Sequence, residues 1–386
     1  MKATKEIIEK ILERGVEEVI EKSHLEAALK SGKKLIVKFG IDPTSPDLHL
    51  GHMVPLRKLR QFQEAGHKIV LIIGDFTATI GDPSGRSEER KPITSTEVKK
   101  NLKKYLLLAN KVINIKKCKI SFNSSWFEKT GIEKIIKLSR ASSLQQILRR
   151  ADFQERMNAG NDISMLELWY PLFQGYDSVR IKADVEIGGT DQKFNLLMGR
   201  RVQRYFGISE QDILTVSLIE GTDGTKKMSK SAGNYIALDA KPNYMYGKIM
   251  SVPDILVKKY FLLLTDLEEK DFILLSALDQ KKLLARSIIY FLHSQNQAEK
   301  AQKTFFGNAE EKAQKEYEVL RGIAWFAFLM ENRFSSSISE AKRLIEQGGV
   351  SLNGVKVKRN DPIIESGIAK IGKKQFIKIK IKEATT

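Results

Sequence analysis

The first half of the chain alternates short apolar runs with longer segments in which apolar residues recur at helical spacing. Residues 33–42 (KKLIVKFGID) predict a buried strand, and residues 67–75 (HKIVLIIGD) predict a second strand that is apolar almost throughout. Between them, Leu56, Leu59 and Phe62 mark one face of a helix. A strand–helix–strand unit of this kind is typical of a parallel sheet covered on both faces. Ligands of such sheets bind beyond the carboxyl ends of the strands.

The alternation continues toward the middle of the chain. Thr94 and Glu97 have the spacing of a capping box, which predicts the start of a helix that runs to about Asn110. Further expected elements are helices in 131–176, strands at 179–189 and 212–221 with a helix at about 191–205 between them, and helices through most of 240–300. The pattern therefore predicts an α/β fold, in which a Rossmann-like parallel-sheet domain is followed by an α-helical domain.

The last part of the chain follows a different pattern. A polar segment, 308–319, is expected to lead into a separate unit, in which Ser337 and Glu340 predict a capping box. Asn353-Gly354 is a strong signal for a two-residue hairpin turn. Residues 376–382 (FIKIKIK) alternate isoleucine and lysine, which predicts a strand with one apolar and one basic face. We expect a small α+β domain here.

Charge adds a candidate partner to this picture. The 386 residues include 65 Lys and Arg against 47 Asp and Glu, a formal charge of +18. Such an excess favours contact with a polyanion such as RNA, although a genome that simply favours lysine would also give it. Residues 333–386 hold 12 basic residues against 5 acidic ones, so part of the excess is concentrated in the C-terminal unit.

Cysteine content and hydropathy indicate the compartment. The single cysteine, Cys118, excludes an internal disulfide and fits the reducing cytoplasm. No run of 18 apolar residues predicts a membrane span, so no membrane contact is expected. Residues 1–15 form an amphipathic helical pattern without the apolar centre of a secretory signal. We therefore expect a cytoplasmic protein.

Two of the five histidines, His49 and His52, stand three residues apart where the first predicted strand turns into the helix. A structural zinc site needs four ligands that usually include cysteine, and Cys118 has no partner, so no metal site is predicted. A helix start instead attracts phosphate, to which two imidazoles add donors. Gly51 keeps the backbone between them bare, so that a flat base could lie against it.

A second candidate lies in residues 223–234 (DGTKKMSKSAGN). Lys227 and Lys230 stand in a loop between glycines, among small hydroxyl residues. Such a loop could move two cations onto a polyphosphate, where neutralising charge is most of the catalysis. The alternative is an ordinary solvated basic loop.

Residues 168–195 hold the third candidate. Tyr170, Gln174 and Asp177 stand at i, i+4 and i+7, so one helical face presents all three polar groups. Spacing alone fits a solvent-exposed face as well. Pro171 predicts that this helix is irregular or starts late.

Together these motifs resemble a known family. HLGH (49–52) after a first strand and KMSKS (227–231) after a late strand are similar to the two signatures of class I aminoacyl-tRNA synthetases. Residues 168–195 resemble the tyrosine-binding helix of the tyrosyl-tRNA synthetases. With FGIDPT, GDPSG and GGTDQ, the likeness covers nearly the whole chain. It includes the basic C-terminal module, which resembles a small RNA-binding fold of a ribosomal protein and of pseudouridine synthases.

The resemblance implies a role for each site residue. The tyrosine substrate would be held by Asp177, which accepts from its phenol, and by Asp82, Tyr170 and Gln174 around its ammonium. The phosphates of ATP would be served by Thr44, His49 and His52, with Lys227 and Lys230 as mobile cations. The other implied contacts to ATP, some of them at the ribose or the substrate rim, are Asp42, Gly51, Gly189, Asp191, Gln192, Met228, Ser229 and Ser231.

Lys38 departs from the family's best-known branch. That branch has a tyrosine four residues before the aspartate of DPT, where it helps to bind the phenol, whereas this chain has Lys38. A second bacterial branch is similar to this chain here. The ammonium of Lys38 could donate to the phenol oxygen or point elsewhere.

The resemblance also implies partners and domains. ATP would bring Mg²⁺ with it, and L-tyrosine, tRNA(Tyr) and a second copy of the chain would complete a homodimeric ligase. The expected domains are 1–232 (catalytic, with a helical insertion at about 120–175), 233–320 (anticodon-binding) and 325–386 (RNA-binding).

Three alternatives remain open from the sequence. A tryptophanyl enzyme would share both signatures, but it gives no reason for the C-terminal module. A small nucleotidylyltransferase with HxGH would leave KMSKS and the basic tail unexplained. The third alternative is an RNA-binding cofactor that retains an inactive synthetase core.

Overall fold

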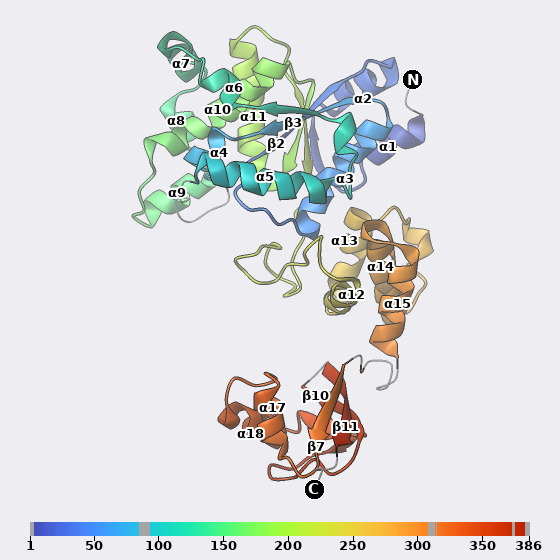
Figure 1. The fold of residues 1–386 in the computed structure, drawn as a ribbon. Coiled ribbons are helices and arrows are strands. Elements are labelled where there is room, and N and C mark those ends of the chain that lie inside the picture. The colour runs from blue at the N-terminus through green and yellow to red at the C-terminus, as the bar shows by residue number, and fades with distance from the viewer. Residues whose placement is uncertain (1–3, 85–92, 308–312, 314, 373–374, 383–386) are drawn as a thin grey trace. The chain divides into compact units, whose positions relative to one another are not determined.

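The computed structural model describes residues 4–84, 93–307, 313, 315–372 and 375–382 (Figure 1). Contacts divide the chain into two compact units, one of Met1–Lys241 with Lys248–Leu292 and the other of Pro242–Gly247 with His293–Thr386. Part of the segment 308–319 lies outside the described residues. The functional boundaries at 1–232, 233–320 and 325–386 stay a prediction.

The first unit is built on a six-stranded sheet in the order β1-β6-β5-β2-β3-β4. Five strands are parallel, and β1 pairs antiparallel with β6 at one edge. The strands are β1 (Val16–Ile20), β2 (Ile36–Ile41), β3 (Lys68–Ile73), β4 (Lys119–Phe122), β5 (Val185–Gly189) and β6 (Asp212–Val216). The predicted parallel sheet is confirmed. The edge strand β1 and the short β4, whose polar residues lack a continuous apolar run, were not predicted.

The order of the strands places a switch point between β2 and β5. From β2 the chain proceeds outward to β3 and β4, and from β5 it proceeds in the other direction to β6. The β2–β5 ladder has only two registered pairs, Val37 with Val185 and Lys38 with Glu186. Beyond that point the two strands no longer pair, which opens a crevice at their carboxyl ends.

Helices surround this sheet, and several of their ends match the predictions. Thr94 and Glu97 form the expected capping box, and the helix they start ends at Ala109, with Asn110 as its C-cap. The helices of the first unit are α1 (Lys5–Leu12), α2 (Lys22–Ser31), α3 (Leu50–Glu64), α4 (Thr77–Ile80), α5 (Ser95–Ala109), α6 (Ser124–Phe127), α7 (Ile132–Ser139), α8 (Leu144–Ile147), α9 (Ala151–Asn158), α10 (Met165–Ile181), α11 (Lys193–Tyr205), α13 (Asp254–Leu264) and α14 (Ala277–Leu292). Among the described residues, no helix is long and apolar enough to cross a membrane.

Helix α10 corrects two expectations. It starts at Met165, with Ser164 and Glu167 as a capping box, and it includes Pro171 without interruption, so it is neither late nor broken there. Arg156 forms a buried ion pair with the Glu167 carboxylate at 2.5 Å, which fixes this helix start. Residues 179–181 were expected in a strand but form the last turn of α10. The apolar residues of that turn suit a buried helix as well as a strand.

The C-terminal unit contains a five-stranded sheet in the order β7-β11-β10-β8-β9. Its elements are β7 (Glu316–Leu320), α17 (Trp325–Glu331), α18 (Ile338–Glu346), β8 (Val350–Leu352), β9 (Val355–Lys356), β10 (Gly367–Ile371) and β11 (Gln375–Lys382). Helix α15 (Gln295–Phe306) precedes them, and α12 (Pro242–Met250) has residues in both units. In β11 the isoleucines at 377 and 379 are buried and the lysines at 378 and 380 are exposed, as predicted.

The two short-range signals in this unit had different outcomes. Asn353 and Gly354 both have positive φ angles, 49° and 84°, which confirms the predicted hairpin turn between β8 and β9. The capping box is only half formed. Ser337 Oγ accepts from the Glu340 N–H, but the Glu340 carboxylate accepts from the N–H of Ser336 rather than Ser337.

The positive φ of Gly354 generates a stability prediction. Gly354→Val should destabilise the β8–β9 hairpin by about 1–2 kcal/mol, because a side chain with a Cβ is strained in the left-handed region. Hydrogen exchange of the β8 and β10 amides in the full chain would accelerate accordingly. Gly354→Asn is the matched control, since asparagine tolerates this region better and should cause a smaller change. Equal exchange rates in the two variants would contradict this explanation.

Candidate active site

A cavity of about 1030 Å³ opens beyond the carboxyl ends of β2 and β5. Its lining combines the turn before α3, the face of α10 and the loop after β6. The predicted site residues that line it are Asp42, Thr44, His49, Gly51, His52, Asp82, Tyr170, Gln174, Asp177, Gly189, Asp191, Gln192, Lys227, Met228, Ser229 and Ser231. Lys38 and Lys230 are not among its lining residues.

His49 and His52 occupy the start of α3 and hold each other in place. The Nδ1 of His49 accepts from the backbone N–H of Gly51, and the Nδ1 of His52 accepts from the backbone N–H of His49, both at 3.2 Å. The rings lie 4.0 Å apart between centroids. Because each Nδ1 accepts, the proton of each neutral ring resides on Nε2. The pair therefore offers two N–H donors rather than two metal-binding lone pairs.

Both imidazoles are neutral in this environment. Burial, together with the smaller effects of the nearby charges of Lys230 and Lys227, lowers the pKa of His49 to about 2 and that of His52 to about 4. An isolated histidine titrates near pH 6.5. Neutral imidazoles at the N-terminus of a helix can donate hydrogen bonds to an incoming anion. Because they carry no charge, they need no acidic partner before that anion binds.

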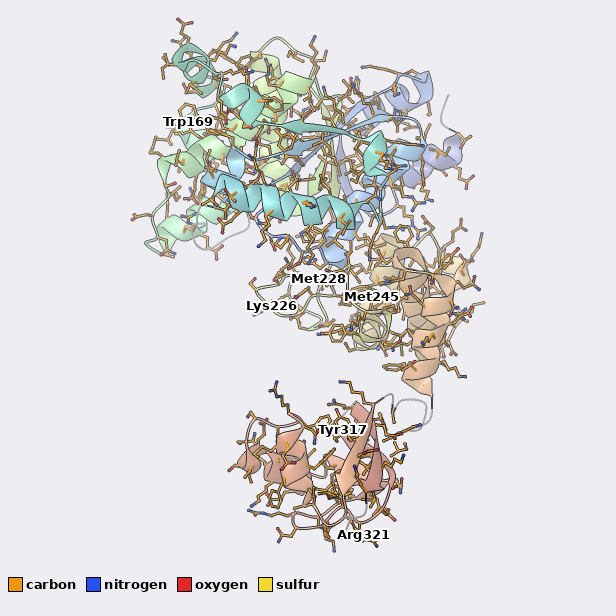
Figure 2. All side chains as sticks on the ribbon, viewed as in Figure 1. Trp169, Lys226, Met228, Met245, Tyr317 and Arg321 are labelled. Atoms are coloured by element: carbon orange, nitrogen blue, oxygen red, sulfur yellow. The ribbon has the colours of Figure 1, made fainter. Side chains whose placement is uncertain are left out.

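The loop after β6 is tied to the histidine turn by backbone contacts. Leu50 donates to the carbonyl of Ile236 at 3.0 Å, and Leu238 donates to the carbonyl of Leu48 at 2.8 Å. Figure 2 marks Lys226 and Met228 in this loop, where Met228 is buried. The segment that follows the KMSKS signature is therefore hydrogen-bonded to the turn that carries the HLGH signature.

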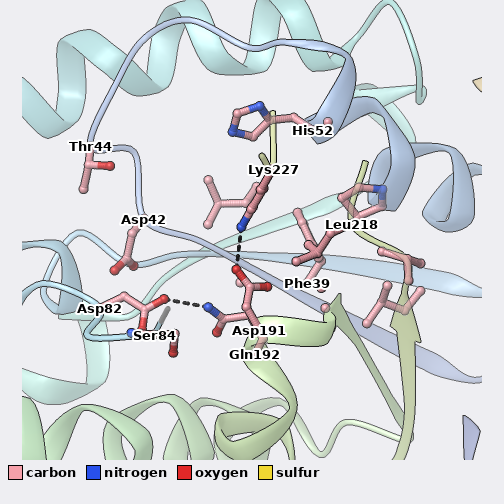
Figure 3. Close-up of a pocket in the computed structure, with 18 of the residues that line it drawn as sticks. Phe39, Asp42, Thr44, His52, Asp82, Ser84, Asp191, Gln192, Leu218 and Lys227 are labelled. Carbon is pink, nitrogen blue, oxygen red and sulfur yellow. Dashed lines mark hydrogen bonds and ion pairs between the residues drawn. The ribbon is translucent and has the colours of Figure 1, made fainter. Parts of the chain in front are cut away.

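Lys227 and Lys230 are each paired with a carboxylate. Lys227 Nζ lies 2.5 Å from Asp191, and Figure 3 shows this pair reaching across the cavity. Lys230 contacts Ser45 and lies 3.3 Å from Asp47, on the turn that precedes the histidines. The Lys227 ammonium is thus held at the cavity, whereas the Lys230 ammonium is held on the histidine turn, outside the cavity lining.

Asn234 is a functional residue of this loop that the sequence analysis did not assign. It is 4% exposed, and its amide nitrogen donates to the Asp223 carboxylate and to the carbonyls of Lys226 and Lys227. Its oxygen accepts from the N–H of Ser229 at 2.8 Å. Asn234 therefore closes the loop on itself and fixes the backbone that carries the lysines. Its place within the DGTKKMSKSAGN motif was the available signal.

The opposite end of the cavity is lined by acidic and amide groups. Tyr170 donates to Asp42 at 2.8 Å, and Thr77 donates to the other oxygen of that carboxylate at 2.9 Å. Gly74 makes this approach possible, because a Cβ there would lie 1.9 Å from Asp42 Oδ1. Asp42, grouped with the ATP contacts from sequence, thus bonds directly to Tyr170. Burial and the surrounding carboxylates raise the pKa of Tyr170, so it stays a neutral donor.

Asp177 is a buried carboxyl at the base of this end, 4% exposed. The Trp126 indole N–H donates to Oδ1 at 3.0 Å, and the Asn123 amide donates to Oδ2 at 3.4 Å. Burial raises the pKa of Asp177 to about 7, against the opposing effects of Lys38 and of these two hydrogen bonds. Asn123 and Trp126 follow β4 and were missed because that strand was missed.

Asp82 is held by a group of amides. Gln192 Nε2 donates to it at 2.7 Å, as Figure 3 shows, so Gln192 belongs to this group as well. Asn195, fully buried, donates to Ser84, Gln174 and Gln192 at 3.1–3.2 Å. These contacts fix the orientation of the Gln174 side chain relative to Asp82. Asn195 and Ser84 were not assigned from the sequence.

Lys38 lies behind the cavity wall. It is 0% exposed, and its Nζ lies 2.8 Å from Glu186 and donates to the Gln174 carbonyl and Ser178 Oγ. Of the two directions left open from sequence, this geometry matches the one away from the substrate. Among the described residues, no group of three or more His, Cys, Asp or Glu side chains is placed to hold a metal ion.

Comparison with known proteins shows the family of the chain. The family model described as "tRNA synthetases class I (W and Y)" matches residues 30–317, and the S4 domain model matches 327–367. The tyrosine–tRNA ligase of Aquifex aeolicus is 44% identical, with 96% of this chain and 97% of the relative covered. That of Dehalococcoides mccartyi is 43% identical, with 96% and 98% covered.

Solved structures support the fold. A C-terminally truncated mitochondrial tyrosyl-tRNA synthetase of Aspergillus nidulans matches with a TM-score of 0.65 at 22% identity, over 78% of this chain and 93% of that one. The tyrosyl-tRNA synthetase of Archaeoglobus fulgidus, solved with L-tyrosine, matches with a TM-score of 0.61 at 24% identity, over 77% and 98%. The sequence and its relatives together lead to one assignment: the chain belongs to the tyrosine–tRNA ligases, a family of class I aminoacyl-tRNA synthetases.

Proposed function

We propose that the cavity binds tyrosine at its acidic end and ATP at its histidine end, so that the tyrosine carboxylate attacks the α-phosphorus. Pyrophosphate leaves, and the tyrosyl group of the adenylate is then transferred to tRNA(Tyr), which is the activity of the family. The observation that carries the residue assignment is the buried Asp177 carboxyl, which faces the cavity with both oxygens oriented by neutral donors.

The acidic end suits the two polar ends of tyrosine. Ionised Asp177 accepts from the phenol, and the loss of that hydroxyl in phenylalanine would leave a buried carboxylate without its partner, which opposes binding. Asp82, with Tyr170 and Gln174, surrounds the ammonium group. The network through Asn195 holds these acceptors in place before the substrate arrives.

The histidine end suits the phosphates. The Nε2–H groups of His49 and His52, with Thr44, donate to phosphate oxygens at the start of α3. Lys227 and Lys230 exchange Asp191 and Asp47 for the phosphates as negative charge develops on the leaving pyrophosphate. Mg²⁺ enters bound to ATP, since this ion usually relies on substrate phosphates and few protein ligands. The remaining ATP contacts are Gly51, Gly189, Gln192, Met228, Ser229 and Ser231.

The two predicted domains that follow the catalytic domain would supply the RNA contacts. We propose that the helices of 233–320 bind the anticodon and that 325–386, which contains the S4 match, binds RNA through its basic residues. The catalytic domain would be 1–232 with its insertion at 120–175, and the enzyme would work in the cytoplasm. Exposed apolar side chains on α7 and the start of α10, Ile132 at 71% and Leu166 at 56%, support a homodimer formed through the insertion.

The substrate assignment is tested by ATP–pyrophosphate exchange without tRNA, using each of the twenty amino acids in turn. We expect exchange with tyrosine alone, because only its phenol completes the Asp177 site. Exchange with tryptophan would overturn the reading of Tyr170, Gln174 and Asp177. A complete lack of exchange would favour an RNA-binding cofactor.

Lys230→Ala should slow activation more than it weakens tyrosine binding. The lysine acts on charge that develops in the transition state, so the pre-steady-state rate of adenylate formation should fall by about 10²-fold. The dissociation constant of tyrosine should change less than about threefold. Lys241→Ala, at an exposed lysine before α12, controls for a general loss of charge. An unchanged pre-steady-state rate would contradict the assignment.

The dimer proposal is tested by sedimentation of Ile132→Glu combined with Leu166→Glu. Two charges on the apolar surface should shift the sedimenting mass from twice 43.8 kDa to the 43.8 kDa chain. Ile255→Glu, at a residue of α13 that is 86% exposed, is the matched control and should leave the dimer intact. A wild-type protein that sediments as a single chain would refute the proposal.

A further inference from the structure

A buried ion pair lies at the point where the cavity begins. Lys38 on β2 and Glu186 on β5 face each other at the last registered position of the ladder, 2.8 Å apart. Their side chains are 0% and 1% exposed. Two charges removed from water in this way are costly unless further hydrogen bonds complete their environment. Further hydrogen bonds complete the environment of this pair, and several of them join it to helix α10 at the acidic end of the cavity.

The cation of the pair binds helix α10. Lys38 Nζ donates to the Gln174 carbonyl at 2.7 Å and to Ser178 Oγ at 2.8 Å. These residues lie on either side of Asp177 in the same stretch of helix. Lys38 therefore holds that stretch of α10 against β2, although Lys38 does not itself line the cavity.

The anion of the pair orients a side chain that lines the cavity. Glu186 Oε1 accepts from Gln174 Nε2 at 3.2 Å, and the Gln174 Oε1 accepts from Asn195 at 3.1 Å. With its nitrogen on a carboxylate and its oxygen on a donor, the amide has one defined orientation. Glu186 Oε2 accepts hydrogen bonds from Ser178 Oγ and from Nε2 of the fully buried Gln211.

We propose that the Lys38–Glu186 pair is a positioning device for tyrosine recognition: it sets the orientation of the Gln174 amide and supplies the positive charge that keeps Asp177 ionised. Lys38 lies outside the cavity lining, whereas Glu186 is part of it. The proposal rests on the assignment of Gln174 and Asp177 to tyrosine. Within that assignment, the pair gives a function to Lys38, which stands where the family's best-known branch has a tyrosine. The lysine would act through Gln174 and Asp177 without itself lining the cavity.

The charges around Asp177 support the electrostatic part of this role. Lys38 from β2 opposes the burial that raises the pKa of Asp177, whereas Glu186 from β5 adds to the increase, and the effect of Lys38 is the larger. Tyr170, earlier in α10, is the other titratable group that interacts with Asp177. Trp126 and Asn123, from α6 and the end of β4, contribute uncharged donors.

An inert core pair would behave differently from a positioning pair. If Lys38 and Glu186 only stabilised the fold, removing either charge would weaken tyrosine and ATP binding together and would not shift their pH dependence in a defined direction. If they set the ionisation of Asp177, the two charges have opposite signs and their removal has opposite effects. The direction in which each substitution shifts the pH midpoint of tyrosine binding therefore separates the two explanations.

The test is equilibrium dialysis of tyrosine against the full-length protein between pH 5 and 9. In the wild type, affinity should fall on the acid side of about pH 7 as Asp177 takes up a proton. Lys38→Met should move this midpoint upward by about one pH unit, or roughly tenfold in the protonation constant, and weaken tyrosine at pH 6 by about tenfold. Glu186→Gln, which retains an oxygen acceptor for Gln174, should move the midpoint downward.

Controls separate the possible failures. The Michaelis constant for ATP should change less than about threefold in both variants, since the pair is at the tyrosine end. Shifts of both midpoints in the same direction, or no shift in Glu186→Gln, would overturn the proposal while wild-type exchange with tyrosine left the function intact. Should Lys38→Met fail to fold, Glu186→Gln alone decides by its sign. A wild type that neither binds nor activates tyrosine would instead refute the function.

Discussion

The separation of β2 from β5 is the constraint on which the rest of the structure depends. Neighbouring parallel strands normally stay paired, but here the chain runs outward in opposite directions from these two, and the ladder stops after Lys38 and Glu186. The carboxyl ends diverge, and a cavity of about 1030 Å³ takes the place of continued pairing. The histidine turn, the carboxylates of the acidic end and the lysine loop reach it because they follow or flank these strands.

Burial then decides the electrostatics of the two ends. At one end it keeps two imidazoles neutral, with both Nδ1 atoms engaged by backbone N–H groups, so that Nε2–H donors face the cavity. At the other end it raises the pKa of Asp177 to about 7, with the charge of the buried Lys38 opposing the increase. The cations of the loop are paired with Asp191 and Asp47, so binding a polyphosphate requires an exchange of partners rather than the capture of isolated charges.

Local patterns predicted much of this arrangement. The capping box at Thr94, the hairpin turn at Asn353-Gly354 and the alternation along β11 depend on neighbouring residues only, and all three are confirmed. Failures came where a pattern fits two structures. Val179 and Ile181 flank the exposed Arg180, an alternation that suits a strand as well as a helix end. Pro171 is accommodated in α10, whose start is fixed by the ion pair of Glu167 with Arg156.

The sequence by itself determined the family, the parallel sheet and most of the polar side chains that line the cavity, because these depend on motifs and on the period of apolar residues. Only the tertiary structure decided which groups share a hydrogen-bond network. Asn123, Trp126 and Asn195 bond to residues more than 20 positions away, and Lys38 lies behind the wall because Glu186, 148 residues later, is its neighbour across two strands. Such contacts leave no periodic trace in the chain, since they arise when strands far apart in sequence become adjacent.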